Sequence, residues 1–322
     1  MEIVYFSVLG LLFMSLSYIN SKSTAFKLII VRLNGGLGNQ LFQYAVGYSL
    51  AIKNQDVMKI DLINQSYFGY SASPSGHEVM NFNIRAQIAS ADEVESFRTP
   101  YGALSSIKRI FNQKVLKRYY HDWHPEIMAL KGDVYLDGYF QSSQYFSQVS
   151  DQLCQEFTLN RSLLTNCLDI CNLINKERCS VSVHVRRGDY VNNPRNKVLR
   201  DICSPDYFYE AINRLELEFN DVTLIVFSDD IEWVKNNLTW KANTIFISDM
   251  LGRNRGSLSA SEELFLMSNC HHNIISNSTF SWWGAYLNQN KKKMVIAPSL
   301  WNRSQIFNHK NIIPTGWILV PV

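Results

Sequence analysis

The sequence predicts an α/β fold made of two Rossmann-like domains that face each other across a cleft. Its 322 residues suit two domains of about 150 residues each. Two stretches alternate apolar strands with helical segments, one from Lys27 and one from Leu163. Polar or glycine residues follow where several strands end, and open α/β sheets bind ligands at that edge. We therefore expect one domain at residues 27–150 and a second at residues 151–322.

The bulk composition is that of an ordinary globular protein. The chain is 46% hydrophobic and 18% charged, with a formal net charge of +3. This charge is too small for a nucleic-acid-binding protein, which would show basic clusters. The six cysteines form no C-x-x-C pair and have no metal-ligand spacing, so we expect mostly reduced thiols.

Residues 1–26 differ from the rest of the chain. An apolar segment at residues 3–19 is at the short end for a membrane span. Only Glu2 is charged ahead of it, unlike the basic start of a signal peptide, and the positive charges of Lys22 and Lys27 follow it. The sequence thus predicts a membrane anchor that leaves the remaining chain in the cytoplasm. The alternatives are a peripheral hydrophobic helix and a start codon assigned too early.

The first domain opens with a strand, a glycine loop and a helix. Residues 27–31 form an apolar strand, residues 35–38 (GGLG) break it, and residues 40–53 carry apolar side chains at helical spacing. The glycines let the backbone approach a ligand, and the helix start favours an anion. Leu41 stands where a dinucleotide fingerprint has its third glycine, so the loop matches that fingerprint only in part.

The remaining elements of the first domain give a weaker pattern. A strand is expected after the glycine-loop helix, at residues 57–60, which completes a βαβ opening. Residues 90–97 and 105–119 look helical, residues 133–137 form the last strand, and residues 143–157 form a connecting helix.

The second domain repeats the alternation of strands and helices. Ser204 followed by Pro205 is a typical helix start, with a capping side chain and proline in the first turn. Helices are expected at residues 163–174, 204–219, 261–267 and 282–288, and strands at residues 180–185, 223–227, 244–247, 272–275 and 293–297.

Two arginines follow the strand at residues 180–185. Arg186, Arg187, Gly188 and Asp189 come at once after its last valine. Arginine presents a planar fork that matches phosphate or carboxylate oxygens in pairs. Asp189 can orient one guanidinium and leave the other for a ligand. The alternative is a structural arginine–aspartate ion pair at the surface.

Four stretches of the chain together resemble the α-1,2-fucosyltransferase family. They are residues 35–45 (GGLGNQLFQYA), 138–141 (GYFQ), 184–190 (HVRRGDY) and 276–285 (SNSTFSWWGA), in the family's order. The resemblance covers the chain from about Lys27 to its end. It implies a glycosyltransferase of GT-B architecture that moves L-fucose from GDP-fucose to the 2-hydroxyl of a terminal galactose on a glycan, with inversion at the fucose anomeric carbon. It implies no cofactor beyond the donor, and a Golgi membrane as the location if the source is a eukaryote.

The reaction and the resemblance together select the candidate site. Breaking the bond between fucose and GDP places negative charge on the β-phosphate, which needs positive charge nearby. The chain contains no Asp-x-Asp sequence to hold a metal, so we expect arginine and backbone amides at a helix start in its place. The resemblance implies that Arg186 contacts the β-phosphate and that Asn39 faces the reacting sugar. The residues expected to be catalytic are Arg186, Asn39 and Asp189, and those expected to bind the donor are His184, Arg187, Asp229, Asp230, Ser278, Thr279, Phe280, Gly36 and Gly38.

Several of these residues have a structural alternative. We expect His184 with Asp229 or Asp230 to border the guanine, but His184 also suits a core position, and either aspartate also suits the start of the next helix. Trp282 and Trp283 are expected in the core rather than as a sugar platform.

Two other functions stay open. One is a nicotinamide-dependent oxidoreductase that uses the glycine loop and Asp61. The other is a catalytically inactive carbohydrate-binding protein on the same fold.

Overall fold

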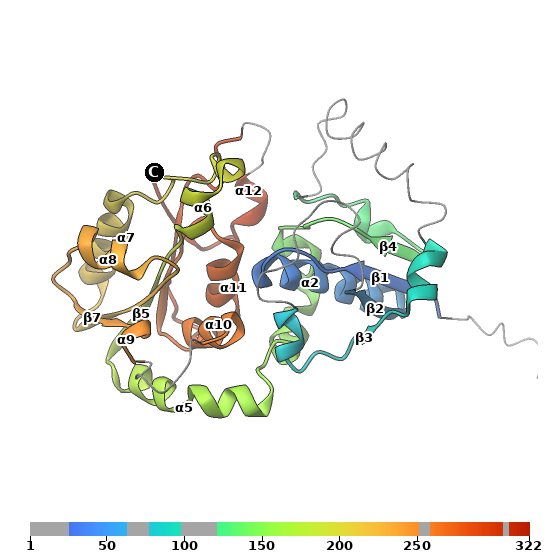
Figure 1. Ribbon diagram of the computed structural model, residues 1–322, viewed down its shortest axis with the longest axis horizontal. Coiled ribbons are helices and arrows are strands. Elements are labelled where there is room, and N and C mark those ends of the chain that lie inside the picture. Colours follow the sequence, from blue (N-terminus) through green and yellow to red (C-terminus); the bar gives the residue numbers. More distant parts are fainter. Residues whose placement is uncertain (1–25, 63–76, 98–120, 251–257, 305–308) are drawn as a thin grey trace, which may run out of the picture.

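Two parallel β-sheets form the framework of the computed structural model, which describes residues 26–62, 77–97, 121–250, 258–304 and 309–322 (Figure 1). The predicted α/β class with parallel sheets is confirmed. The four-stranded sheet contains β1 (Leu28–Arg32), β2 (Val57–Asp61), β3 (Gln87–Ile88) and β4 (Val134–Leu136). The six-stranded sheet contains β5 (Cys179–Val185), β6 (Val222–Ser228), β7 (Asn243–Phe246), β8 (His272–Ile274), β9 (Val295–Pro298) and β10 (Ile318–Val320).

The strand order of each sheet reverses once. The first sheet runs β3-β2-β1-β4 and the second runs β7-β6-β5-β8-β9-β10. In such doubly wound sheets, a crevice opens outside the carboxyl ends of the strands where the order reverses. The crevices are therefore expected between β1 and β4 and between β5 and β8.

Helices connect the strands and cover the sheets (Figure 1). Short 3₁₀ turns lie at η1 (Glu78–Asn81), η2 (Ile127–Ala129), η3 (Ser143–Tyr145), η4 (Ser147–Val149) and η5 (Pro194–Asn196). The labelled α-helices are α2 (Leu37–Asn54), α4 (Ser150–Glu156), α5 (Arg161–Lys176), α6 (Gly188–Asn192), α7 (Pro205–Glu218), α8 (Ile231–Asn237), α9 (Ile247–Met250), α10 (Ala260–Ser268), α11 (Thr279–Leu287) and α12 (His309–Ile312). Residues 91–97 are helical as well, within the helix expected at residues 90–97.

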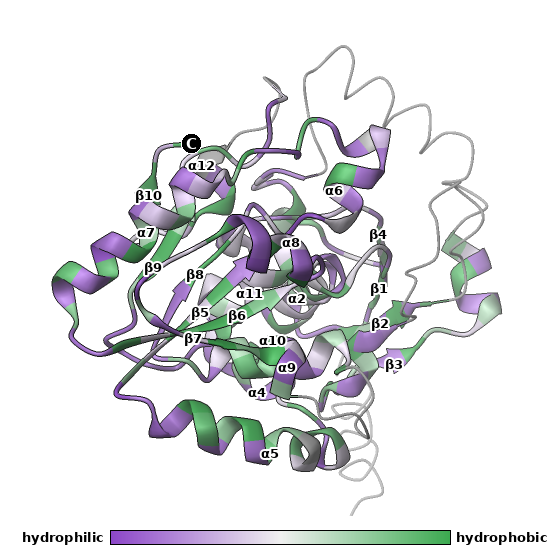
Figure 2. Cartoon of the chain, turned by 60° about the vertical axis from the view of Figure 1, so that its left-hand side comes forward, coloured by the Kyte–Doolittle hydropathy of each residue, from purple (hydrophilic) through white to green (hydrophobic). Residues whose placement is uncertain are grey.

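The central strand β5 is buried along its whole length, on both faces. Its alternating valines meet the helices, as the sequence predicts, while Ser182 and His184 are buried as well. Ser182 is satisfied because its hydroxyl accepts a hydrogen bond from the side chain of Asn273 at 2.7 Å. Figure 2 shows the hydrophobic character of β5 and β6. This double burial is typical of parallel sheets covered by helices.

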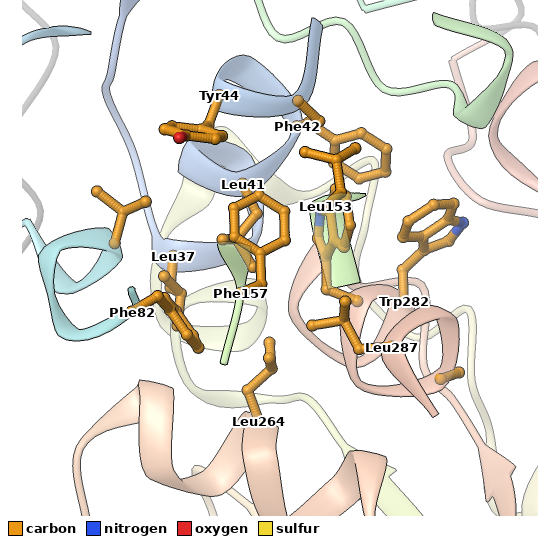
Figure 3. Close-up of a cluster of buried hydrophobic side chains, with 14 of the residues drawn as sticks. Leu37, Leu41, Phe42, Tyr44, Phe82, Leu153, Phe157, Leu264, Trp282 and Leu287 are labelled. Carbon is orange, nitrogen blue, oxygen red and sulfur yellow. The ribbon is translucent and has the colours of Figure 1, made fainter. Parts of the chain in front are cut away.

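Helices α2 and α11 pack against each other between the two sheets (Figures 1 and 3). The ring centroid of Phe42 on α2 lies 4.5 Å from that of Trp282 and 5.1 Å from that of Trp283 on α11. Both tryptophans are fully buried, so the prediction that they belong to the core is confirmed. One hydrophobic cluster therefore runs from β1 to α11, and the predicted domain boundary at residue 150 coincides with no break in the core. The division into two domains stays a prediction.

The starts of α2 and α11 touch through a glycine. A Cβ atom on Gly38 would lie 2.4 Å from the carbonyl carbon of Thr279 and 2.5 Å from the backbone nitrogen of Phe280. Because both neighbours are backbone atoms, they have no side-chain freedom with which to move aside. Close approach of two helices thus explains this glycine, whereas a Cβ on Gly36 would meet nothing within 4 Å.

Some predicted elements differ from the structure. The helix expected over residues 143–157 is wrong in its first half, where the 3₁₀ turns η3 and η4 precede α4. Helices α2 and α11 each begin three residues before their expected starts, at Leu37 and Thr279. No bounds were predicted for strand β10 or for helix α8, although Asp229 or Asp230 was expected to suit the start of that helix.

The predicted anchor at residues 3–19 and the helix expected at residues 105–119 lie outside the described residues. Within the ranges that the structure describes, no helix combines the length and the apolar character needed to cross a membrane.

We expect Gly38→Ala to lower the free energy of unfolding by about 1–3 kcal/mol, because its Cβ overpacks two backbone segments that cannot yield easily. Gly36→Ala is the matched control, two residues away in open space, and should change stability by less than about 1 kcal/mol. Urea unfolding followed by circular dichroism measures both. Equal losses in the two variants would contradict the proposed contact.

Candidate functional site

A cavity of about 760 Å³ lies where the two sheets bring their carboxyl ends together. Its lining comes from the segment after β1 and from both sides of β4 in one sheet, and from β5 and the segments that follow β5, β6, β7, β8 and β9 in the other. Both crevices expected from the strand order therefore contribute to one cavity. All the predicted site residues except Arg187 and Asp230 line it: Gly36, Gly38, Asn39, His184, Arg186, Asp189, Asp229, Ser278, Thr279 and Phe280.

Arg186 is held between two carboxylates at the end of β5. Its Nη2 lies 2.6 Å from Asp189 Oδ1, and its Nη1 lies 3.0 Å from Asp229 Oδ2. Burial by itself would lower the pKa of Arg186, but the charges of Asp229 and Asp189 outweigh it and raise the pKa. The guanidinium is therefore charged and fixed in position, and one third of its side chain remains exposed.

Arg187 points away from the cavity. Its guanidinium carbon lies 3.7 Å from the centroid of the Trp233 ring, and its Nε donates to Asp230 at 3.3 Å. Asp230 also accepts a hydrogen bond from the backbone N–H of Trp233, so it caps the start of α8, as its structural alternative predicts. Asp189 thus orients the arginine that lines the cavity, while Arg187 is engaged by α8.

Asp229 braces the loop that carries both arginines. Besides its ion pair with Arg186, it accepts the backbone N–H of Arg187 at 2.8 Å. A Cβ on Gly188 would lie 2.6 Å from Asp229 Oδ2, so a larger residue here would push this carboxylate away from its present position. Each carboxylate oxygen can accept a further hydrogen bond, and Asp229 lines the cavity.

His184 is both a buried strand residue and part of the cavity lining. Only 4% of its surface is exposed, and its Nδ1 has no hydrogen-bond partner among the described residues. Burial and the charge of Arg186 together lower the pKa of His184 to about 3, although the charge of Asp229 opposes the shift. The imidazole is therefore neutral, and its Nδ1 is buried.

Asn39 joins the two halves of the cavity. Its Oδ1 accepts hydrogen bonds from Gln141 Nε2 at 3.0 Å and from Thr279 Oγ1 at 3.1 Å. Gln141 follows β4 in the first sheet, whereas Thr279 begins α11 beside the second. Because Oδ1 accepts both hydrogen bonds, the amide group of Asn39 is fixed, and its Nδ2 points away from Gln141 and Thr279.

The start of α11 offers uncapped backbone amides to the cavity. Ser278 precedes the helix without capping it through its side chain, and Thr279 and Phe280 begin it. The first N–H groups of a helix have no partner within the helix, and they carry its partial positive charge. This arrangement suits an anion next to Arg186.

Sequence reasoning missed several lining residues, among them Glu263 on α10. Burial and the charges of Glu78 and Asp229 together raise the pKa of Glu263 to about 7, although the charge of Arg186 opposes them. The sequence does contain a signal for the start of this helix. Ser259 and Glu262 form a capping box, and α10 begins at Ala260, one residue before its expected start. Two other missed residues, His121 and Tyr139, line the cavity from the side of the first sheet.

Asp61 lies outside the lining of this cavity. It is 1% exposed and accepts a hydrogen bond from the hydroxyl of Tyr135 at 2.5 Å. The oxidoreductase alternative needs this carboxylate for a ribose, and its position within the first sheet does not support that alternative.

The sequence matches a known family over nearly its whole length. The model of glycosyl transferase family 11 matches residues 9–320. An alpha-1,2-colitosyltransferase of Escherichia coli is 33% identical over 300 residues, which cover 91% of this chain and 99% of that protein. The O-antigen biosynthesis glycosyltransferase WbnK of Escherichia coli is 30% identical over 306 residues, which cover 89% and 98%. A galactoside alpha-(1,2)-fucosyltransferase 1 of Lagothrix lagotricha is 28% identical over 265 residues, which cover 79% and 63%.

Solved structures show a similar fold at low sequence identity. NodZ alpha-1,6-fucosyltransferase soaked with GDP-fucose has a TM-score of 0.52 and 14% identity, and the match covers 81% of this chain and 92% of that one. An Arabidopsis thaliana FUT1 variant in complex with GDP has a TM-score of 0.50 and 12% identity, covering 86% and 71%. These findings confirm the resemblance drawn from the four sequence stretches.

The raised pKa of Glu263 predicts a stability difference that depends on pH. The folded chain holds this proton up to about pH 7, whereas an unfolded glutamate loses it near 4.5, so stability falls as the pH rises between these values. We expect Glu263→Gln to match the parent below pH 4.5. Above pH 7 it should be more stable by about 1–3 kcal/mol.

Thermal and urea unfolding at pH 4.5 and pH 8 measure this difference, with exposed Glu216→Gln on α7 as the matched control. A Glu263→Gln variant that is no more stable than the parent at pH 8 would show that folding does not raise the pKa of Glu263.

Proposed function

Because the chain belongs to glycosyl transferase family 11, we propose that it is an inverting transferase that moves L-fucose from GDP-fucose to the 2-hydroxyl of a terminal galactose on a glycan. One observation carries the proposal: Arg186, fixed by two carboxylates, shares a cavity with the uncapped start of α11. Relatives named as α-1,2-transferases support the linkage.

The diphosphate of the donor is proposed to bind between Arg186 and the start of α11. Cleavage of the bond between fucose C1 and the β-phosphate oxygen leaves negative charge on GDP. A guanidinium and backbone amides that are already in place stabilise that charge, which is greater in the transition state than in the bound donor. No metal is required in this scheme. The oxygen of the acceptor's 2-hydroxyl attacks C1 from the face opposite GDP as the bond from C1 to the β-phosphate oxygen breaks, and the hydroxyl proton passes to the solvent. The attack from the opposite face inverts the configuration.

The guanine is proposed to lie against His184 and Asp229. Asp229 lines the cavity and keeps free lone pairs, whereas Asp230 caps α8 outside it. Guanine presents adjacent N–H donors, which suit a carboxylate. The segment 151–322 would then bind the donor. The segment 27–150, which contributes Asn39 and Gln141, would face the acceptor.

A second candidate donor is GDP-colitose. A relative that is 33% identical is named alpha-1,2-colitosyltransferase. Colitose lacks the 3-hydroxyl of fucose, so the two donors differ by one polar group. A site that binds this hydroxyl discriminates strongly against its absence.

Product analysis tests the proposal. The full chain is incubated with GDP-fucose or GDP-colitose and a panel of galactosides, and released GDP and product linkage are scored. We expect fucosyl transfer to the 2-hydroxyl. The rate of transfer with EDTA in excess should lie within about twofold of the rate without EDTA. Preference for GDP-colitose would reassign the donor, and loss of activity restored by Mn²⁺ would overturn the metal-free scheme.

Arg186→Lys tests the phosphate clamp. Lysine keeps the charge but loses the planar fork, and it cannot bridge two carboxylates and a phosphate in the same way. We expect kcat to fall by about 10²–10³, with GDP binding weakened less. Arg187→Lys, whose side chain lies outside the cavity, is the matched control and should keep most of its kcat. If Arg187→Lys lost kcat and Arg186→Lys kept it, Arg187 rather than Arg186 would be the arginine that binds the phosphate.

A further inference from the structure

Two aromatic rings stack on each other in the wall of the cavity. The ring centroids of His121 and Tyr139 lie 4.6 Å apart, and the ring planes differ by 10°. Both residues line the cavity and both are only partly buried. Neither takes part in the binding of the donor as proposed above. Both come from the part of the chain that forms the first sheet.

The backbone that presents Tyr139 is strained. Phe140 has a φ of 52°, in the left-handed region that bulky residues rarely adopt, and its side chain is buried. A Cβ on Gly138 would lie 2.8 Å from Cζ of Phe140, so a glycine is needed where the ring folds back. As a result Phe140 packs inward, while Tyr139 and Gln141 line the cavity. Strain of this kind is often found where a site requires a fixed geometry.

A hydrogen-bonded chain fixes the ring pair relative to Asn39. Gln141 donates its backbone N–H to the carbonyl of His121 at 2.7 Å, and its side chain is hydrogen-bonded to the His121 ring. The same side chain donates to Asn39 Oδ1 at 3.0 Å. The pair is thus tied to the residue proposed to face the reacting sugar.

The His121 ring carries no charge near neutral pH. Burial lowers the pKa of His121 to about 4, although the hydrogen bond to Gln141 opposes the shift. Because the two rings stack face to face, the pair can present the outer face of one ring to a ligand, and the neutral imidazole beside it adds no charge to desolvate.

We propose that the His121–Tyr139 pair is the platform against which the acceptor sugar packs, and that this sugar is a pyranose with a continuous C–H face, as in a β-galactoside. This inference rests on the proposed transferase function. The axial 4-hydroxyl of galactose leaves the C–H bonds at carbons 3, 4 and 5 on one face. These bonds are weakly positive and complement the negative face of an aromatic ring. The equatorial 2-hydroxyl stays at the edge of the sugar ring, free to attack.

A stacked guanine is the competing occupant of this surface. The ring pair lies on the segments on either side of β4, in the part of the chain that forms the first sheet. Arg186, His184, Asp229 and the start of α11 lie on or after strands of the second sheet. A nucleotide bound at the switch point of the second sheet is held by that sheet's own loops. The acceptor is therefore the occupant that the arrangement favours.

Two variants of Tyr139 separate these occupants. Tyr139→Leu removes the ring, and Tyr139→Phe, the matched control, keeps it. For a β-galactoside acceptor we expect Tyr139→Leu to raise KM by about 3–10-fold and Tyr139→Phe to leave KM near the parent value. The Kd of GDP and the hydrolysis of GDP-fucose without acceptor should stay within about twofold of the parent in both variants.

Three results would overturn the proposal: an unchanged acceptor KM in Tyr139→Leu, a loss that appears in the Kd of GDP, and a Tyr139→Phe variant as impaired as Tyr139→Leu. Saturation-transfer NMR on the parent, with methyl β-galactoside and GDP, covers the case in which Tyr139→Leu does not fold. It should show the strongest transfer to the protons on carbons 3, 4 and 5, and uniform or absent transfer contradicts the platform. If the parent transfers no fucose, the proposed function fails by itself, and this NMR measurement still tests the platform.

Discussion

The contact between the starts of α2 and α11 determines how the two sheets meet around the cavity. Gly38 lets one helix start meet the backbone of the other, and Phe42 with Trp282 and Trp283 extends this contact into a buried aromatic cluster. Each helix follows a central strand of its own sheet, β1 or β8. Fixing the helices together therefore holds the carboxyl ends of both sheets around one cavity. The amide of Asn39, bonded from both sides, depends on the same contact.

Charge in the cavity is arranged by pairing rather than by burial alone. Arg186 lies between two carboxylates, and Asp229 also holds the backbone of the loop that presents this arginine. Such pairs fix a guanidinium in position, while the uncapped start of α11 contributes partial positive charge with no side chain to neutralise it. The resulting surface is preorganised for an anion. The turn before Gln141, which is strained at Phe140, lies on the opposite side of the cavity, where His121 and Tyr139 make the lining aromatic.

The order of strands and helices could be predicted from the sequence because periodicity and capping are local. Ser204 caps α7 as expected, and Trp282 is buried as expected. The start of α11 was placed too late because serine, threonine and asparagine favour turns, and only tertiary packing shows that Thr279 is already helical. The direction of Arg187 depends on Trp233, which lies on the helix after Asp230, and no bounds were predicted for that helix. The pairing of His121 with Tyr139 likewise joins segments that no sequence pattern relates.

We propose that the donor's diphosphate binds between Arg186 and the start of α11, and a crystal structure of the chain with GDP tests this placement. We expect the β-phosphate within hydrogen-bonding distance of the Arg186 guanidinium and of the backbone N–H groups of Thr279 or Phe280, with the guanine beside Asp229. A diphosphate bound instead to the glycine loop at Gly36, with Arg186 still closed between its two carboxylates and making no contact with GDP, would contradict it.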